Sequence, residues 1–224
     1  MSLFYYLLAT LLYILALPVL IYLRFKPKYN VSIPARFFLK DNAPFEKEGI
    51  WFHACSLGEV RSLKPFIESL RDVHVNISAI TQTGFREALQ YQSADVRYLP
   101  FEIFLPFWIT KQKTLVVLEA ELWPMLFWVA KQKGIKTILL NARISDRSYQ
   151  SYLRFAFVYR WIFSAIDVVF AQSVLDKERL ENLGAKNVRV GGNIKTFQRY
   201  EVTNVYKKLD NRRVVLLAST HEKE

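Results

Sequence analysis

Short apolar runs rich in β-branched residues alternate with longer segments of helical character along most of the chain. The apolar runs lie at 50–55, 75–81, 114–119, 136–141, 167–171 and 187–191, with a weaker one at 96–99. The helical segments lie at 59–71, 84–93, 122–133, 148–165 and 173–183. Strands that alternate with helices are typical of a parallel sheet covered on both faces, with right-handed crossovers. The alternation therefore predicts an α/β domain.

The composition agrees with a folded domain. Hydrophobic residues make up 52% of the 224 residues and charged residues 23%, which supplies a core and argues against disorder. A single cysteine, Cys55, excludes an internal disulfide and a multi-cysteine zinc site. Because Cys55 ends the first predicted strand, we expect a buried structural thiol. His53, His74 and His221 are scattered, so we expect no metal site.

The first 23 residues predict a membrane anchor. Residues 3–23 carry no charged side chain, and a helix of this length is roughly 31 Å long, enough to span a bilayer. A cleaved signal peptide is the alternative, but the start of the chain has no basic residue. We therefore expect an uncleaved single-pass anchor with the domain on the cytoplasmic side, by the positive-inside rule. The basic flank comprises Arg24, Lys26, Lys28, Arg36 and Lys40.

The pattern divides the chain into four parts. We expect an anchor at 1–23, a basic juxtamembrane linker at 24–49, an α/β domain at 50–197, and a linker with the start of another domain at 198–224. Neither the G-x-G-x-x-G nor the P-loop nucleotide fingerprint is present.

The net charge of +11 implies an anionic partner: nucleic acid, a membrane surface or a phosphorylated substrate. Much of that charge lies beside the predicted anchor, which favours membrane phospholipid over nucleic acid. Aromatic residues are also concentrated at 98–108 and, together with Arg154 and Arg160, at 149–163. Their helical spacing favours core positions, although such residues also suit a lipid interface.

One strand-to-helix junction carries a carboxylate. The run IWFHA at the first strand is followed by Ser56, which can cap a helix, and Glu59 stands three residues later, the spacing of a capping box. Open α/β sheets bind ligands outside the carboxyl ends of their strands. Glu59 is therefore either a helix cap or the acid/base group of an active site, and the spacing alone does not decide between them.

Three further strand ends carry polar motifs, and all four would converge on one edge of the sheet. Thr81 and Thr83 can be simple helix caps. Glu119, which ends the 114–119 run, and Glu121 can be solvated residues of a first helical turn, or desolvated carboxylates paired with Arg143. The motifs are TQTG at 81–84, EAELWP at 119–124 and NARISDR at 141–147.

Taken together, HACSLGEV, TQTG, EAELWP, NARISDRS, GGNIKTF and ASTHE resemble the family of 3-deoxy-D-manno-octulosonic acid (Kdo) transferases of lipopolysaccharide assembly. The resemblance implies the GT-B architecture, in which an N-terminal Rossmann-like domain binds the lipid A precursor and a C-terminal one binds the donor CMP-Kdo. It also implies an inner-membrane enzyme that inverts the anomeric centre and needs one general base, the glutamate of the S-x-G-E motif, here Glu59.

The resemblance also implies roles for other residues. It implies no metal or other cofactor, since the CMP leaving group already activates the donor. Acceptor-binding or orienting residues would be Ser56, Gly58, Thr81, Thr83, Glu119, Glu121 and Arg143. Donor-binding residues would be Ser219, Thr220 and His221.

Two departures from the family pattern matter. Where the family has Asn-x-Lys-Phe-Asp, residues 193–197 read Asn-Ile-Lys-Thr-Phe, which leaves the role of that aspartate without a counterpart. Only Ser219 to Glu222 would belong to the donor side, so we expect this chain alone to be unable to transfer Kdo. A noncatalytic, membrane-anchored module that binds an anionic lipid is the alternative function.

Overall fold

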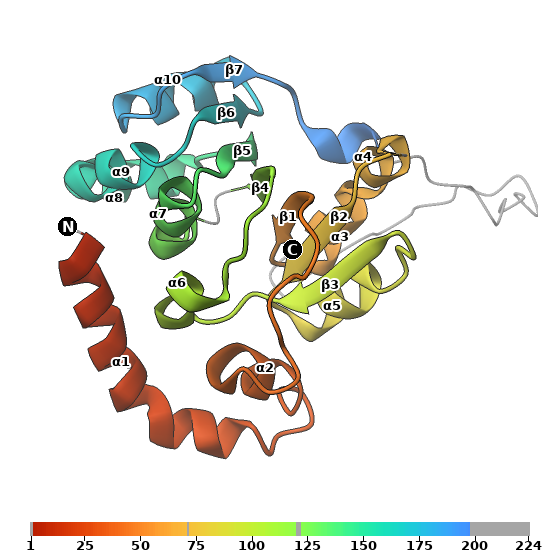
Figure 1. Cartoon of the computed structure of the whole chain (residues 1–224). Helices are drawn as coiled ribbons and strands as arrows, with labels where there is room; N and C mark the ends of the chain where they lie inside the picture. Colours follow the sequence, from red (N-terminus) through yellow and green to blue (C-terminus); the bar gives the residue numbers. More distant parts are fainter. Residues whose placement is uncertain (1, 71, 120–121, 198–224) are drawn as a thin grey trace, which may run out of the picture.

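The computed structural model describes residues 2–70, 72–119 and 122–197. Within them, seven parallel strands form one sheet in the order β3-β2-β1-β4-β5-β6-β7, with helices on both faces (Figure 1). The predicted α/β, Rossmann-like class is confirmed. The strands are β1 (Ile50–Ala54), β2 (Val75–Ala79), β3 (Ala94–Tyr98), β4 (Thr114–Leu118), β5 (Lys136–Ala142), β6 (Val168–Ala171) and β7 (Val188–Val190).

The helices largely follow the predicted segments, with two of those segments divided. The segment at 59–71 forms two short helices, the second with proline in its first turn, and the segment at 148–165 breaks at Phe155. The helices are α1 (Ser2–Leu23), α2 (Ser32–Phe38), α3 (Leu57–Ser62), α4 (Lys64–Ser69), α5 (Gln82–Ala88), α6 (Leu105–Trp108), α7 (Pro124–Gln132), α8 (Asp146–Arg154), α9 (Ala156–Phe163) and α10 (Val174–Asn182), with 3-10 turns η1 (Glu102–Phe104) and η2 (Ile194–Phe197).

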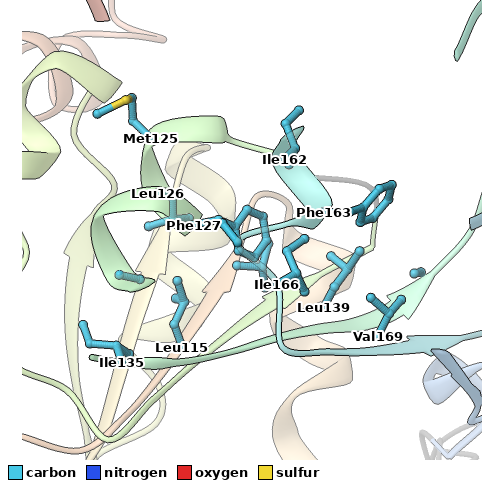
Figure 2. Packing of buried hydrophobic residues seen from close by; sticks show 14 of the residues in the cluster. Leu115, Met125, Leu126, Phe127, Ile135, Leu139, Ile162, Phe163, Ile166 and Val169 are labelled. Carbon is cyan, nitrogen blue, oxygen red and sulfur yellow. The ribbon is translucent and has the colours of Figure 1, made fainter. Parts of the chain in front are cut away.

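Two hydrophobic clusters cover the two faces of the sheet, and strand β4 contributes side chains to both. Leu115 and Val117 belong to one cluster, whereas Val116 and Leu118 belong to the other. This is the two-residue period of a strand buried on both faces. Figure 2 shows the larger cluster, in which side chains of α7 and α9 pack on β4, β5 and β6.

The segment at 24–49, expected as a linker, packs into the domain. It contains α2, and Asn42 is 3% exposed. The Asn42 amide donates to the carbonyls of Ala35 and Tyr98 and accepts from the Tyr98 backbone N–H. Phe45 packs edge-on against Trp51 and Trp108. This segment therefore closes the β3 side of the domain.

The two aromatic stretches divide between core and surface. Tyr98, Trp108 and Phe163 are buried, as helical spacing favoured. Phe107 is 82% exposed and Phe157 is 62% exposed. Each stretch therefore contributes some aromatic side chains to the core and leaves others exposed on the surface.

Helix α1 is long and apolar enough, by length and composition, to cross a membrane, and its mean hydropathy is 2.3. Figure 1 shows it running along one side of the domain, from near α9 towards α2. Its residues Ala9 and Leu20 are buried.

Candidate functional site

Strands β2, β1, β4 and β5 are neighbours in the sheet, so their carboxyl ends meet at one edge. The chain order changes direction between β1 and β4, which is the switch point where doubly wound sheets bind ligands. Ser56, Thr81, Glu119 and Arg143 follow these four strands. The predicted convergence of the four polar motifs on one edge is confirmed by this topology.

The carboxylate of Glu59 is held by the loop that precedes its own helix. It is 6% exposed, and accepts from the Ser56 hydroxyl at 2.7 Å and from the Cys55 backbone N–H at 2.8 Å. Ser56 in turn caps α3 by accepting from the Glu59 backbone N–H at 3.4 Å. The side-chain cap of a capping box is thus formed, whereas the Glu59 carboxylate bonds the backbone N–H of Cys55, one residue before the cap. Because a carboxylate oxygen can accept more than one hydrogen bond, this role as a cap is compatible with acid/base chemistry.

Thr81 caps α5 and ties it to the Glu59 loop. Its hydroxyl accepts from the Gly84 backbone N–H at 3.1 Å and donates to the Cys55 carbonyl at 3.0 Å. A Cβ added at Gly84 would lie 3.0 Å from Thr81 Oγ1 and 3.2 Å from the carbonyl carbon of Ser56. A side chain at this position would therefore require the first turns of α3 and α5 to move apart by a few tenths of an ångström.

Two other predicted acceptor residues lie at the open side of this edge. Gly58 is exposed in the first turn of α3, and a Cβ added there would meet nothing within 4 Å. Thr83 is exposed in the first turn of α5, with its hydroxyl 3.4 Å from that of Thr81. Both residues therefore border space that a ligand can enter.

Glu119, directly after β4, has an unusual backbone conformation and forms an ion pair. Its φ of 58° lies in the left-handed region, which is costly for a residue with a long side chain. The Lys195 ammonium group lies 2.5 Å from its carboxylate. The partner is therefore Lys195 rather than Arg143, the pairing weighed from the sequence.

Asn141 explains why Lys195 reaches the edge. Asn141 is 1% exposed at the end of β5, and its side-chain oxygen accepts from the Ile194 backbone N–H at 3.1 Å. This bond draws the segment after β7 back across the strand ends. The sequence does not reveal Lys195 as a site residue, because 76 positions separate it from Glu119 and no local spacing signals such a pair.

Arg143 is exposed at the end of β5 and, with Glu119, lines a small cavity of about 10 Å³ whose other walls are apolar. Leu122 and Tyr152 line this cavity and also an open groove of about 360 Å³ between α8 and α9. A cation and a groove lined by aliphatic and aromatic residues, two of them tyrosines, therefore lie close to the same strand end. The remaining predicted site residues, Glu121, Ser219, Thr220 and His221, lie outside the described residues.

His53 and Cys55 belong to the interior beneath the edge. His53 is fully buried, burial and the nearby Arg36 lower its pKa to about 3, and its Nδ1 lies 2.8 Å from the Ser78 hydroxyl. Cys55 is 8% exposed, as expected of a structural thiol. Across the described parts of the chain, no group of three or more His, Cys, Asp or Glu side chains could hold a metal ion.

This edge can hold one oriented carboxylate beside an open helical turn, with cationic groups a few strands away. A carboxylate at a helix N-terminus is favoured in its ionised form by the helix dipole. Such a group can accept a proton from a bound hydroxyl. The cations suit an anionic ligand.

The comparisons with known proteins agree with this geometry. The family model of 3-deoxy-D-manno-octulosonic-acid transferase (Kdo transferase) matches residues 31–198. A 3-deoxy-D-manno-octulosonic acid transferase of Chlamydia pneumoniae is 32% identical over 203 residues, covering 83% of this chain and 46% of the relative. The protein of that name from Haemophilus influenzae is 30% identical over 224 residues, covering 88% and 51%.

A bifunctional glycosyltransferase/methyltransferase of Fusobacterium nucleatum is 34% identical over 166 residues, covering 67% of this chain and 26% of the relative. The chain thus spans about half the length, or less, of these curated relatives. The matched region includes α2, the whole sheet and every described residue of the strand-end site. The chain belongs to the Kdo transferase family.

Proposed function

We propose that this chain is the acceptor-binding half of a glycosyltransferase of lipopolysaccharide biosynthesis, which transfers Kdo from CMP-Kdo to a lipid A precursor, lipid IVA. The observation that carries the proposal is the Glu59 carboxylate, 6% exposed and fixed by Ser56 and Cys55 at the carboxyl edge of the sheet. Its family membership supplies the reaction class.

Glu59 acts as the general base. The acceptor hydroxyl attacks the anomeric carbon of Kdo, its proton passes to the Glu59 carboxylate, and the bond to the CMP phosphate breaks as CMP leaves with the bonding electrons. One displacement inverts the anomeric centre. A base fixed before the substrate arrives needs little reorganisation at the moment of reaction.

The neighbouring residues position the acceptor. Gly58 and Thr83 border the open side of the edge, where the sugar approaches the base. Arg143 contacts an acceptor phosphate, since a guanidinium group suits phosphate geometry. Glu119 orients the acceptor while Lys195 neutralises its charge.

The donor is bound by a second Rossmann-like domain of the GT-B architecture, which includes Ser219, Thr220 and His221. Because the leaving group is already a good one, no metal is assigned to the reaction. The enzyme works at the cytoplasmic face of the inner membrane, where the α1 helix and the basic segment after it contact phospholipid.

The test joins this chain at residue 197 to the C-terminal half of the Haemophilus influenzae relative. Kdo transfer from CMP-Kdo to lipid IVA is then measured. Glu59→Gln should lower turnover by about 10²- to 10⁴-fold, the usual contribution of a general base. The control is Glu68→Gln, since Glu68 is exposed on α4, and its turnover should equal that of the unmodified chimera. Equal turnover in Glu59→Gln would remove Glu59 as the base.

A second function, a noncatalytic module that binds an anionic lipid, predicts a different result. It is favoured by the net charge of +11 and by the groove between α8 and α9, which shares Leu122 and Tyr152 with the small cavity that Arg143 lines. Lipid IVA would then bind to the 224-residue chain with equal affinity in Glu59→Gln, and the chimera would show no transfer.

A further inference from the structure

Helix α1 has one face that is bonded to the domain. The Tyr5 hydroxyl donates to the Glu102 carboxylate, and the Tyr6 hydroxyl donates to the Ile103 carbonyl at 3.0 Å. Further along the helix, the Tyr13 hydroxyl donates to the Phe37 carbonyl at 2.6 Å. Three tyrosines of α1 therefore use their hydroxyls to bond the domain.

Ring contacts reinforce this face. The ring of Tyr5 packs against Trp161 of α9, with centroids 5.6 Å apart, and Tyr13 packs against Phe101 and Phe104 with centroids 5.9 and 5.5 Å away. The contacts extend from the first turn of α1 into its second half. Both parts of the helix therefore lie against the domain, as Figure 1 shows.

These contacts conflict with a helix that crosses the bilayer away from its domain. The domain follows the C-terminal end of α1, so in that arrangement Tyr5 would be carried about 27 Å beyond Leu23, on the far side of the hydrocarbon. Glu102, which is 3% exposed, would lose its Tyr5 donor. The Met125 backbone N–H would still donate to it, but the loss of a donor to a buried carboxylate is costly.

The contacts between α1 and the domain also could not be kept by placing the domain itself in the hydrocarbon of the bilayer. Helix α7 contacts α1, and its Lys131 is 47% exposed. Lys111, which follows α6, is 79% exposed. Exposed ammonium groups are expensive in hydrocarbon. The domain surface around α1 is therefore built for water or headgroups.

The outer face of α1 is apolar along its length. It leads directly to Arg24, Lys26 and Lys28, which suit anionic headgroups. Interfacial helices usually turn a charged face to water, but here the domain covers the inner face, so tyrosine hydroxyls suffice. The exposed side chains include Leu3, Phe4, Leu7, Leu8, Leu11, Leu12, Ile14, Leu15, Val19, Ile21 and Tyr22.

We propose that α1 lies in the plane of the membrane, with its outer face in the acyl region of one leaflet and its tyrosine face on the domain. Phe155, directly before α9, and Phe157, within α9, are 56% and 62% exposed and add apolar surface to the helix that Tyr5 contacts. Pro18 removes one helical hydrogen bond and lets α1 bend with the domain. This arrangement replaces the single crossing expected from hydropathy.

Cysteine labelling tests the arrangement independently of activity. In a Cys55→Ala chain, Ser2→Cys and Lys186→Cys are compared in right-side-out and inverted membrane vesicles with a membrane-impermeant maleimide. Lys186 is exposed on the domain. We expect Ser2→Cys to be labelled only in the vesicle orientation that labels Lys186→Cys. Labelling of the two cysteines from opposite sides would overturn the proposal.

Cross-linking in the same membranes decides the matter if lipid shields residue 2 from the maleimide. The pair Tyr6→Cys with Ile103→Cys should be joined by a short bifunctional methanethiosulfonate, because these residues are in contact. The matched control is Leu7→Cys with Ile103→Cys, since Leu7 is 59% exposed on the outer face, and this pair should stay unlinked. Equal cross-linking of the two pairs, or none of either, would contradict the proposal.

Discussion

Glu59 and Glu102 are both buried carboxylates, 6% and 3% exposed, but they are held in opposite ways. Glu59 is bound by its own loop, through Ser56 and Cys55. Glu102 is bound by Tyr5, 97 residues away, and by the Met125 backbone N–H at 2.9 Å. The first carboxylate depends on one turn of chain and the second on donors from two other segments, α1 and the first turn of α7.

Local and long-range hydrogen bonding suit a buried carboxylate to different roles. A carboxylate fixed locally keeps its geometry when remote parts of the molecule move, which suits a reacting group. A carboxylate fixed by distant segments keeps its hydrogen bonds only while those segments are packed together. The hydrogen bonding of Glu102 therefore depends on the packing of α1, whereas that of Glu59 depends on its own loop. Changes at Glu102 should therefore act on stability, whereas changes at Glu59 should act on the proposed transfer.

The largest effect on stability is expected from pH acting at Glu102. Burial raises its pKa from 4.5 to about 7, so the folded state binds this proton more tightly than the unfolded state. The contribution is complete below pH 4.5 and is lost as pH rises through 7, up to about 3 kcal/mol. Thermal unfolding in detergent from pH 5 to 8 should show stability falling across this range.

Glu102→Gln should flatten that dependence, because a neutral amide has no proton to lose. Glu68→Gln, at an exposed position, should retain the pH dependence of the unmodified chain. If Glu102→Gln and the unmodified chain lose stability in parallel from pH 5 to 8, deprotonation of Glu102 is not the cause of the loss.

A smaller effect is expected at the two glycines that flank the Glu59 loop. Gly84→Ala forces a Cβ to within 3.2 Å of the Ser56 backbone, and should destabilise the fold by about 1 to 3 kcal/mol. Gly58→Ala meets nothing within 4 Å and should be neutral or stabilising by up to about 1 kcal/mol. Denaturant unfolding of the two variants measures the contrast, and equal stability would show that α3 and α5 are not closely packed.

The smallest effect is expected from Ser56→Ala. The substitution removes the α3 cap and the hydroxyl donor to Glu59, and should cost about 1 kcal/mol of folding free energy. Ser69→Ala removes an exposed hydroxyl and should change stability by less than about 0.5 kcal/mol. A Ser56→Ala chain as stable as Ser69→Ala would mean that the local hold on Glu59 is weak.

The sequence predicted what depends on neighbouring residues. The strands follow from β-branched runs, and the Ser56–Glu59 geometry follows from three-residue spacing. It could not reveal Lys195 beside Glu119, or Tyr5 beside Glu102, because folding brings those pairs together across 76 and 97 positions. Likewise α2 lies in a short, proline-containing segment whose helix is stabilised by packing on the domain rather than by its own periodicity.

The backbone at two neighbouring strand ends has a consequence for directed evolution. Glu119 and Asn141 both have positive φ, 58° and 61°, and asparagine tolerates that region better than glutamate does. The substitution Glu119→Gly would relieve the strain at the expense of the ion pair with Lys195. A library selected for heat resistance alone should therefore enrich glycine at this position, whereas one selected for lipopolysaccharide assembly should retain the acid.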